Sequence, residues 1–166
     1  MAQNAFLSIT GQKTGQIKGG VIQKGREGQI AVFAAYHEII SPRDPTSGLA
    51  TGKRMHKPII ITKEIDKSSP VLYQLLCTNE NLTDVTLRFW APNMATSIGT
   101  GQEVQNYTIK LINAQIASIT LNMADNKIPG QTSLPEEERV EFTYQKITWT
   151  WTDGGVTFSD DWLSPV

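Results

Sequence analysis

The sequence predicts a mainly β fold, a two-sheet β-barrel or sandwich with one short α-helix packed on its side. Apolar and polar residues alternate along most of the chain, which is the period of half-buried strands. Glycines and prolines divide these alternating stretches at turns. Apolar residues recur at helical spacing in one segment only. The 166 residues suit one domain, residues 1–166, because a chain of this length buries roughly 70% of its unfolded surface.

The first strands are expected near the N-terminus. Residues 5–10 alternate between apolar and polar side chains, and glycines between positions 11 and 20 then form turns. The stretch from Gln29 to Ile40 has apolar residues on both faces, so we expect a strand with both faces at least partly covered. The β-branched run Ile59-Ile60-Ile61 after Pro58 predicts a further strand.

The helix is predicted for residues 70–79. The run Asp66-Lys67-Ser68-Ser69-Pro70 is a start signal, with Ser69 as the expected N-cap and Pro70 as the first helical residue. Asn79 to Asn81 can end the helix, because asparagine tolerates a positive φ. The apolar residues on one face are Val71, Leu72, Leu75 and Leu76.

Two slips of the alternating pattern interrupt the strands of the C-terminal half. The apolar positions change phase between Leu111 and Ile116, and again between Tyr144 and Ile147. A phase change within a strand indicates an inserted residue or a bend, and bent strands let a sheet curl. The turn Thr152-Asp153-Gly154-Gly155 then predicts one last returning strand.

Two long segments lack a regular pattern. Prolines and glycines interrupt the first, Ser41 to Lys57, and Ala124 to Pro135 forms the second. Compact domains keep loops of this length mainly where the loops bind something. A shorter loop is expected at Gly99-Thr100-Gly101, which lacks the third glycine and the following helix of a nucleotide-binding motif.

Composition argues against several classes of protein. The formal net charge is -1 and no basic run occurs, so no nucleic acid is expected as a partner. No stretch approaches the roughly 20 apolar residues of a membrane-spanning helix, so no membrane insertion is expected. The N-terminus has no basic segment followed by an apolar run, so we expect no signal peptide. The one cysteine, Cys77, cannot form an intrachain disulfide and is expected to be a small buried side chain.

No catalytic or metal-binding constellation is visible in the sequence. His37, His56 and Cys77 fall in a strand, a loop and the helix, and no pair has the spacing of zinc ligands. The acidic runs Glu136–Glu138 and Asp160-Asp161 flank strands and are expected to be solvated. We therefore predict no enzyme activity, no metal and no cofactor.

Residues 52–72, GKRMHKPIIITKEIDKSSPVL, closely resemble the Hcp family, the haemolysin-coregulated proteins. The N-terminal Phe6–Ile9 and the C-terminal strand Glu141–Trp151 are similar as well, so the resemblance covers essentially the whole chain. The residues that carry the motif are His56, Pro58, Lys63, Asp66, Lys67, Ser68, Ser69 and Pro70.

The resemblance implies a β-barrel with a helix on one side, assembled into a homohexamer with a wide central channel. Rings of such proteins stack into the inner tube of a bacterial type VI secretion machine, together with sheath, baseplate and spike proteins, and small effector proteins can ride in the channel. The implied location is the bacterial cytoplasm during assembly, then the extracellular space or a target cell. Because the sequence ends at Val166, we expect no fused toxin domain.

Stacking requires an element that reaches the next ring, and ring closure requires a head-to-tail interface. The segment Ser41 to Met55 is the expected stacking loop, because it is long and braced by prolines. Each contact of its charged residues is expected to contribute about 1 kcal/mol or less, so the stack can later come apart. The residues expected to take part are Arg43, Asp44, Thr46, Ser47, Gly48, Leu49, Ala50, Thr51, Lys53 and Arg54.

Two other functions stay open on the sequence alone. The first is an effector-binding chaperone or adaptor ring that does not form long tubes. The second is a small cell-wall hydrolase with candidate carboxylates at Glu136 to Glu138, against which the missing catalytic constellation weighs. Electron microscopy would separate a tube subunit, which forms rings and stacks, from an adaptor, which forms discrete complexes.

Overall fold

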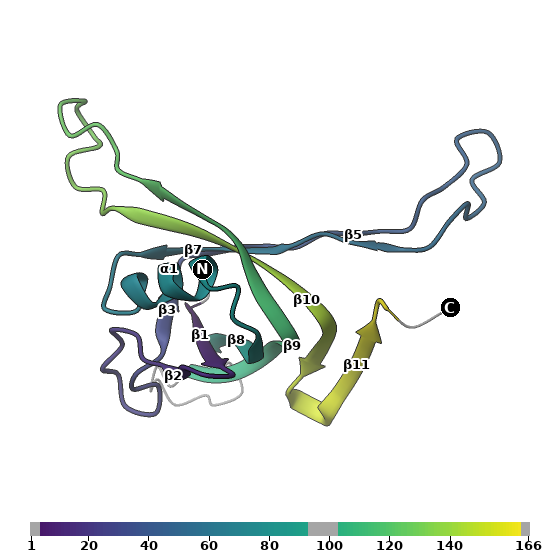
Figure 1. Ribbon diagram of the computed structural model, residues 1–166, viewed down its shortest axis with the longest axis horizontal. Helices are drawn as coiled ribbons and strands as arrows, with labels where there is room; N and C mark the ends of the chain where they lie inside the picture. Colours follow the sequence, from purple (N-terminus) through teal and green to yellow (C-terminus); the bar gives the residue numbers. More distant parts are fainter. Residues whose placement is uncertain (1–3, 93–102, 164–166) are drawn as a thin grey trace.

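The computed structural model describes residues 4–92 and 103–163, and in this part of the chain it confirms a mainly β fold with one short α-helix (Figure 1). The loop expected at Gly99-Thr100-Gly101 lies outside the described residues. The first elements are β1 (Asn4–Gly11), β2 (Gly15–Ile17), β3 (Ile30–Val32), β4 (Ala34–Tyr36), β5 (Ile39–Ile40), β6 (Met55–His56), β7 (Ile59–Glu64) and α1 (Ser69–Cys77). They are followed by β8 (Leu82–Pro92), β9 (Glu103–Asn122), β10 (Glu137–Trp151), the 3-10 turn η1 (Asp153–Gly155) and β11 (Val156–Asp161).

One curled antiparallel sheet contains all strands except the β5–β6 pair. Its order is β2-β1-β8-β9-β10-β7-β4, with β11 added to β10 and β3 added to β1. β7 pairs with the N-terminal end of β10 and β11 with the C-terminal end. The short segment 30–36 bridges the two sides of the curl, because β3 pairs with β1 and β4 pairs with β7.

The core lies on one face of this sheet, where apolar side chains form rows across neighbouring strands. One row, in pairing order, is Leu7, Leu87, Ile109, Trp149 and Phe158. Leu7 and Leu87 are fully buried, whereas Phe158, at the β11 end of the row, is 66% exposed. α1 packs against β9 and covers the core with the buried face that the sequence predicts.

Both predicted slips are confirmed by the burial of the long strands, whose buried positions change phase between Leu111 and Ala114 in β9 and between Tyr144 and Ile147 in β10. Asn113 in β9 has a φ of 52°. The pairing of the two strands also shifts register between Glu141 and Phe142, an irregularity that the sequence did not predict. The Asn113 side-chain amide donates to Oε1 of Gln145 at 3.0 Å, and Gln145 is where the second slip falls. These irregularities bend the two strands, which allows the sheet to curl around the core.

The stretch from Gln29 to Ile40 was predicted as a strand, and the structure divides it into β3, β4 and β5. After pairing with β1, the chain crosses to β7, where the Phe33 N–H donates to the carbonyl oxygen of Thr62 at 2.8 Å. Phe33 and Tyr36 are consequently both 58% exposed. The expectation of two covered faces is therefore wrong for this part of the segment within one chain.

The helix differs from its prediction in two details. It begins at Ser69, so the N-cap is Ser68, whose side chain makes no capping hydrogen bond. The Ser69 hydroxyl is instead used in a buried contact with Glu138. Asn79 has a φ of 49°, which confirms the expected helix end. Cys77 is exposed, so its prediction as a buried side chain is wrong.

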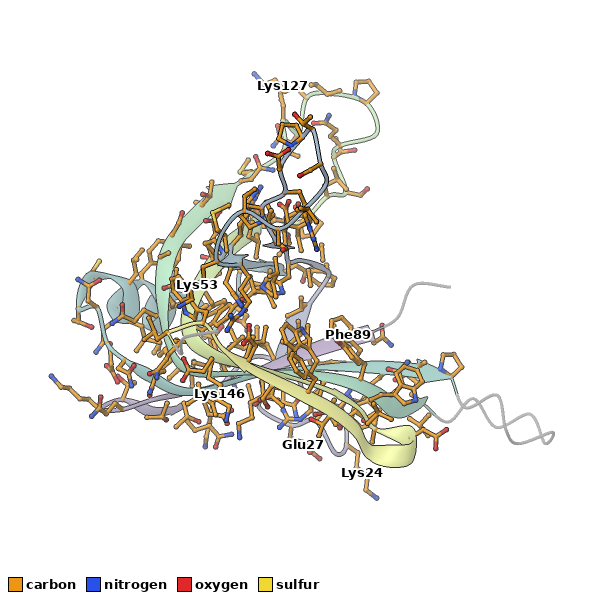
Figure 2. All side chains as sticks on the ribbon, turned by 90° about the vertical axis from the view of Figure 1, so that its right-hand side faces the viewer. Lys24, Glu27, Lys53, Phe89, Lys127 and Lys146 are labelled. Atoms are coloured by element: carbon orange, nitrogen blue, oxygen red, sulfur yellow. The ribbon has the colours of Figure 1, made fainter. Side chains whose placement is uncertain are left out.

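Two segments project from the curled sheet (Figure 1). The first, residues 39–56, connects β5 to β6 and is called the projecting hairpin below. The second is the end of the β9–β10 pair, where Lys127 lies near the tip (Figure 2). The predicted irregular segment Ala124 to Pro135 is confirmed in this second projection. Within the described ranges, no helix has the length and apolar character needed to cross a membrane.

Candidate functional site: the projecting hairpin and its base

The projecting hairpin is more regular than the sequence predicts. β5 and β6 pair at its base, and an isolated bridge joins Arg43 to Ala50 further out. The Thr51 N–H donates to the carbonyl oxygen of Pro42 at 3.0 Å. This pairing survives the prolines because a proline lacks only the N–H donor, while its carbonyl still accepts. The hairpin is therefore a paired, two-stranded ribbon, so the orientation of its base determines where its tip lies.

Asp44 organises the tip of the hairpin. Its Oδ1 accepts the N–H groups of Thr46 at 2.7 Å and Ser47 at 2.8 Å, while its carbonyl accepts the N–H of Gly48. Backbone hydrogen bonds from Ser47 and Thr46 lower the pKa of Asp44. Gly48 has a φ of 70°, a conformation that favours glycine. The turn leaves Leu49 with 68% of its surface exposed, so the tip presents an apolar side chain to solvent.

The structure places the predicted stacking residues along this one projection. Two of them, Asp44 and Arg54, are half-buried. The exposed ones are Arg43, Thr46, Ser47, Gly48, Leu49, Ala50, Thr51 and Lys53.

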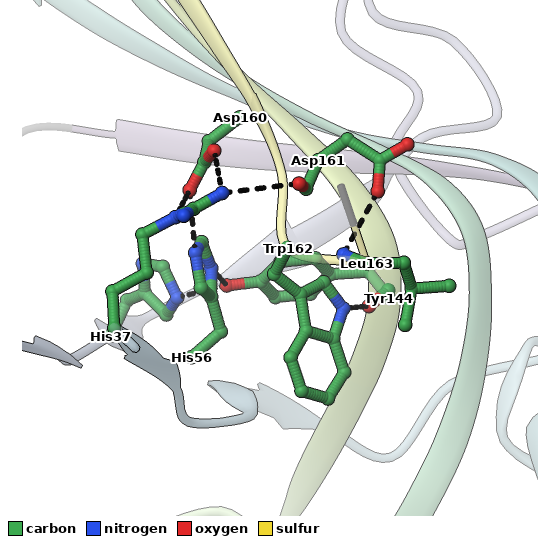
Figure 3. A network of polar contacts seen from close by, with 8 residues as sticks. His37, His56, Tyr144, Asp160, Asp161, Trp162 and Leu163 are labelled. Atoms are coloured by element: carbon green, nitrogen blue, oxygen red, sulfur yellow. Dashed lines mark hydrogen bonds and ion pairs between the residues drawn. The ribbon is translucent and has the colours of Figure 1, made fainter. Parts of the chain in front are cut away.

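A chain of hydrogen bonds ties the base of the hairpin to the sheet (Figure 3). The Oη of Tyr144, on β10, lies 2.7 Å from Nε2 of His37 and 2.8 Å from Nδ1 of His56. Nε2 of His56 lies 2.7 Å from Oδ2 of Asp160, on β11. The two histidines flank the hairpin, one before β5 and one within β6, so Tyr144 contacts both sides of its base.

Asp160 also binds Arg54, which lies just before β6. The guanidinium donates from Nε to Oδ2 at 2.5 Å and from Nη2 to Oδ1 at 2.6 Å, and Nη2 also donates to the carbonyl of Asp161 at 3.1 Å. The Arg54 hydrogen bonds, followed by that of His56, lower the pKa of Asp160. Arg54 was expected to reach charges on an adjacent ring, but its guanidinium is engaged within its own chain.

Burial perturbs the titration of two groups in this base. Burial, and then the charge of His56, lower the pKa of His37 from 6.5. Burial, and then the charge of Asp160, raise the pKa of Tyr144. Tyr144 is therefore a neutral hydroxyl at physiological pH and can donate one hydrogen bond.

Four of the remaining motif residues, Lys63, Asp66, Ser68 and Ser69, take part in a second network around the start of α1. Lys63, on β7, is 1% exposed. Its Nζ lies 2.9 Å from Oγ of Ser69, 3.0 Å from Oδ1 of Asp66 and 3.1 Å from Oε2 of Glu138. Oγ of Ser69 also donates to Oε2 of Glu138 at 2.7 Å. These contacts connect β7, β10 and α1 through buried, mutually satisfied charges.

Asp66 extends this network to the N-terminal turns. Its Oδ2 accepts the N–H of Gly20 at 2.9 Å, and its Oδ1 accepts the N–H of Ser68 at 2.9 Å. Burial opposes ionisation of Asp66, but hydrogen bonds from Ser68 and Lys63 outweigh it and lower its pKa. Of the other motif positions, Pro58 is half-buried, and Lys67 and Pro70 are exposed. Thus the other five motif residues divide between two networks, with His56 in the hairpin base and the other four around the start of α1.

Sequence reasoning missed the partners in both networks. Tyr144 lies 107 positions from His37 and 88 from His56, so no local spacing could connect them. One signal was available for Lys63. It shares the inward face of its strand with Ile59 and Ile61, and a charge on an apolar face requires a buried partner. Glu138, expected to be solvated, is that partner and is 2% exposed.

The sheet face opposite the core is lined with hydroxyls and paired charges. Across five strands, Ser8, Thr86, Lys110, Thr148 and Ser159 form one row. Lys110 forms an ion pair at 2.7 Å with Asp84, and the hydroxyls of Thr148 and Ser159 lie 2.7 Å apart. We call this face the polar wall, and it consists of Ser8, Asp84, Thr86, Arg88, Thr108, Lys110, Lys146, Thr148, Thr150, Thr157 and Ser159.

Two apolar surfaces lie at opposite ends of β10. At its C-terminal end, Trp151, Val156 and Phe158 are 46%, 69% and 66% exposed and form the aromatic patch. The ring of Trp149 stacks on Phe158, with centroids 5.9 Å apart. Near the other end, a groove that we call the side groove is lined by Ala34, Ala35, Tyr36, Ile60, Thr62 and Arg139. Arg139 and Trp151 are separated along the strand by roughly 40 Å, at about 3.3 Å per residue, so the two surfaces do not overlap.

No group of three or more metal-ligating side chains gathers anywhere in residues 4–92 or 103–163. A family model described as "Type VI secretion system effector, Hcp" matches residues 6–151. The chain is also similar to the "Major exported protein" of Pseudomonas aeruginosa. The two are 42% identical in an alignment that covers 100% of this chain and 99% of that protein.

Solved structures share the fold. The chain is similar to the Hcp1 protein of the E. coli EAEC 042 pathovar, with 35% identity and a TM-score of 0.83, over 97% of this chain and 99% of that one. It is also similar to the secreted protein Hcp3 from Pseudomonas aeruginosa. In that comparison the identity is 35% and the TM-score 0.77, over 98% of this chain and 100% of the other.

Proposed function

The chain belongs to the Hcp family of type VI secretion proteins, a family of structural secretion proteins and not of enzymes, and on this basis we propose that it is the subunit of a hexameric ring that stacks into a secretion tube. In this proposal the rings form the inner tube, in contact with sheath, baseplate and spike proteins. Small effector proteins occupy its channel. In this role the protein is structural, since each subunit supplies surfaces that bind identical neighbours.

The observation that carries the proposal is the pair of separate apolar surfaces on one chain. A ring closes head to tail, so each subunit needs two different complementary surfaces. The aromatic patch exposes large side chains at the end of an otherwise buried row, and the side groove offers an apolar floor formed by Ala34, Tyr36 and Ile60. We assign the patch of one subunit to the groove of the next. Phe158 is the anchor of this contact, because buried aromatic residues dominate interface energies.

The polar wall supports the assignment of a channel. Its hydroxyls and ion pairs are already satisfied within the chain, so the wall offers few unpaired groups to a passing protein. A surface of this kind can contain cargo without binding it permanently. The projecting hairpin supports the assignment of stacking, because its exposed tip extends beyond the sheet and is held rigidly at its base (Figure 1).

Replacing Phe158 with aspartate is expected to disassemble the ring. The substitution puts a charge into an apolar contact, and loss of a central aromatic anchor typically costs about 2 kcal/mol or more, roughly 30-fold in affinity, at each interface. The subunit should still fold, because Phe158 is largely exposed within one chain. Native mass spectrometry across a concentration series measures the change, and circular dichroism checks the fold.

Thr157→Asp is the matched control for this experiment. It adds the same charge one residue away, on the polar face of the same strand, where Thr157 pairs with Thr150. Rings should persist in this variant. Rings of undiminished stability in Phe158→Asp would show that the aromatic patch is not the ring contact.

A further inference from the structure

The base of the projecting hairpin contains a linear chain of hydrogen bonds whose protons can be counted. The chain runs from His37 through Tyr144 and His56 to the carboxylate of Asp160. The carboxylate at its end only accepts hydrogen bonds, whereas each neutral histidine and Tyr144 can both donate and accept.

Three contacts join these four groups, and each contact needs one proton. A neutral imidazole supplies one N–H, and the tyrosine supplies one O–H. With both histidines neutral, three protons therefore serve the three contacts. The chain also accommodates one added proton, whose positive charge can lie on His56, against the carboxylate of Asp160, while Tyr144 donates to Nε2 of His37.

A second added proton disrupts the chain. Both histidines then donate to Oη of Tyr144, whose own O–H is left without an acceptor, and two imidazolium rings flank the hydroxyl. The charged groups around the chain do not offset this repulsion at His37. Asp160 is already shared between His56 and Arg54, while Asp161 offers Arg54 only its backbone carbonyl. Beside His37 itself, Lys57 and Glu38 neutralise each other at 2.8 Å.

We propose that Tyr144 is the positioning residue of the projecting hairpin, and that acidification adds a second proton to the His37–Tyr144–His56–Asp160 chain, releases the hairpin and weakens ring stacking without opening the ring. This inference rests on the proposed stacking function. The ring contacts assigned above, Phe158 and the side groove, include none of these groups. Acid should therefore act on the stack and leave the ring closed.

The direction of the effect follows from the lowered pKa of His37. The folded protein binds fewer protons there than the unfolded chain, so His37 contributes stability above pH 6.5 that is lost as the pH falls below 6.5. The lowered pKa of Asp160 acts in the same direction, but only below pH 3.8. Between neutral pH and about pH 5, the histidines therefore determine the response.

The chain has only two histidines, and both lie in this network, so histidine-selective NMR of the ring reports on the network alone. We expect the His37 resonance to titrate below 6.5, because burial lowers the pKa of this imidazole. In parallel, sedimentation of tubes should fall on the order of tenfold from about pH 7.5 to about pH 5.5, the interval in which histidines take up protons. The mass of the ring should not change.

Two variants test the mechanism. Tyr144→Phe keeps the ring of the side chain but removes the hydroxyl, so stacking should already be weak at neutral pH and its pH profile should be flat. His37→Gln can hydrogen bond but cannot take up a proton, so its tubes should persist at acidic pH. Tyr73→Phe, which removes an exposed hydroxyl from α1, should behave as the wild type.

A parallel loss of tubes in wild type and His37→Gln as the pH falls would overturn the inference, as would a normal pH profile in Tyr144→Phe. If Tyr144→Phe fails to fold, the pH profile of tube formation by His37→Gln alone tests the inference. Rings that stack at no pH would instead refute the stacking function, and the two histidine resonances would still report whether the chain of protons exists.

Discussion

Deleting Thr46 to Thr51 is expected to leave rings intact and to abolish tubes. The six residues form the tip of the projecting hairpin, where their hydrogen bonds are local to Asp44 and Pro42. The base ladder of β5 and β6 and the contacts of Tyr144 remain. Single contacts at the tip contribute about 1 kcal/mol or less, but six copies act together between two rings, so their joint removal should eliminate stacking. Negative-stain electron microscopy and native mass distinguish the two levels of assembly.

A same-length control isolates the role of the tip sequence. Replacing Thr46 to Thr51 by glycine and serine keeps the length but removes Leu49, the exposed apolar side chain. Tubes should then form only at higher protein concentration. Loss of the ring itself in the deletion would contradict the assignment of the hairpin to stacking. Wild-type rings that never stack would favour the adaptor function over the tube.

Replacing Lys63 with methionine is expected to destabilise the fold by about 3–5 kcal/mol, because it leaves the buried carboxylate of Glu138 without its cationic partner. The start of α1 should loosen as well, since Ser69 and Asp66 lose their contact with Nζ. Urea unfolding at a fixed protein concentration measures the loss, because assembly makes apparent stability depend on concentration.

Two further variants separate charge from packing at this site. Lys63→Met combined with Glu138→Met removes both charges, and it should be more stable than Lys63→Met alone. Lys67→Met changes an exposed lysine of the same motif and should stay within about 0.5 kcal/mol of the wild type. Equal effects of Lys63→Met and Lys67→Met would mean that the buried network contributes nothing to stability.

Local patterns in the sequence predicted the elements that depend on neighbouring residues. Alternation predicted most strands, the run ending in Pro70 predicted the helix, and phase slips predicted the bends at Asn113 and Gln145. These features depend on the backbone geometry of a few consecutive residues. The predicted start of the helix was wrong by one residue. Ser69 uses its hydroxyl for a tertiary contact with Glu138, which helix propensity and capping signals do not take into account.

The sequence could not predict the network at the hairpin base, for a different reason. Tyr144 and Asp160 meet His56 only because the β10–β11 pair lies beside the hairpin, and these two contacts join residues 88 and 104 positions apart in the sequence. The division of Gln29 to Ile40 into three strands was also unpredictable, because it too depends on pairing with distant strands. The segment leaves one strand partner for another, and nothing in its alternating pattern marks the crossing at Phe33.

The native mass of the purified protein in mild buffer tests the central claim most directly. A hexamer of 18.4 kDa chains has a mass of about 110 kDa (6 × 18.4), and we expect this species, with annular particles in the electron microscope. A chain that stays near 18.4 kDa at high concentration, with no annular particles, would contradict the account.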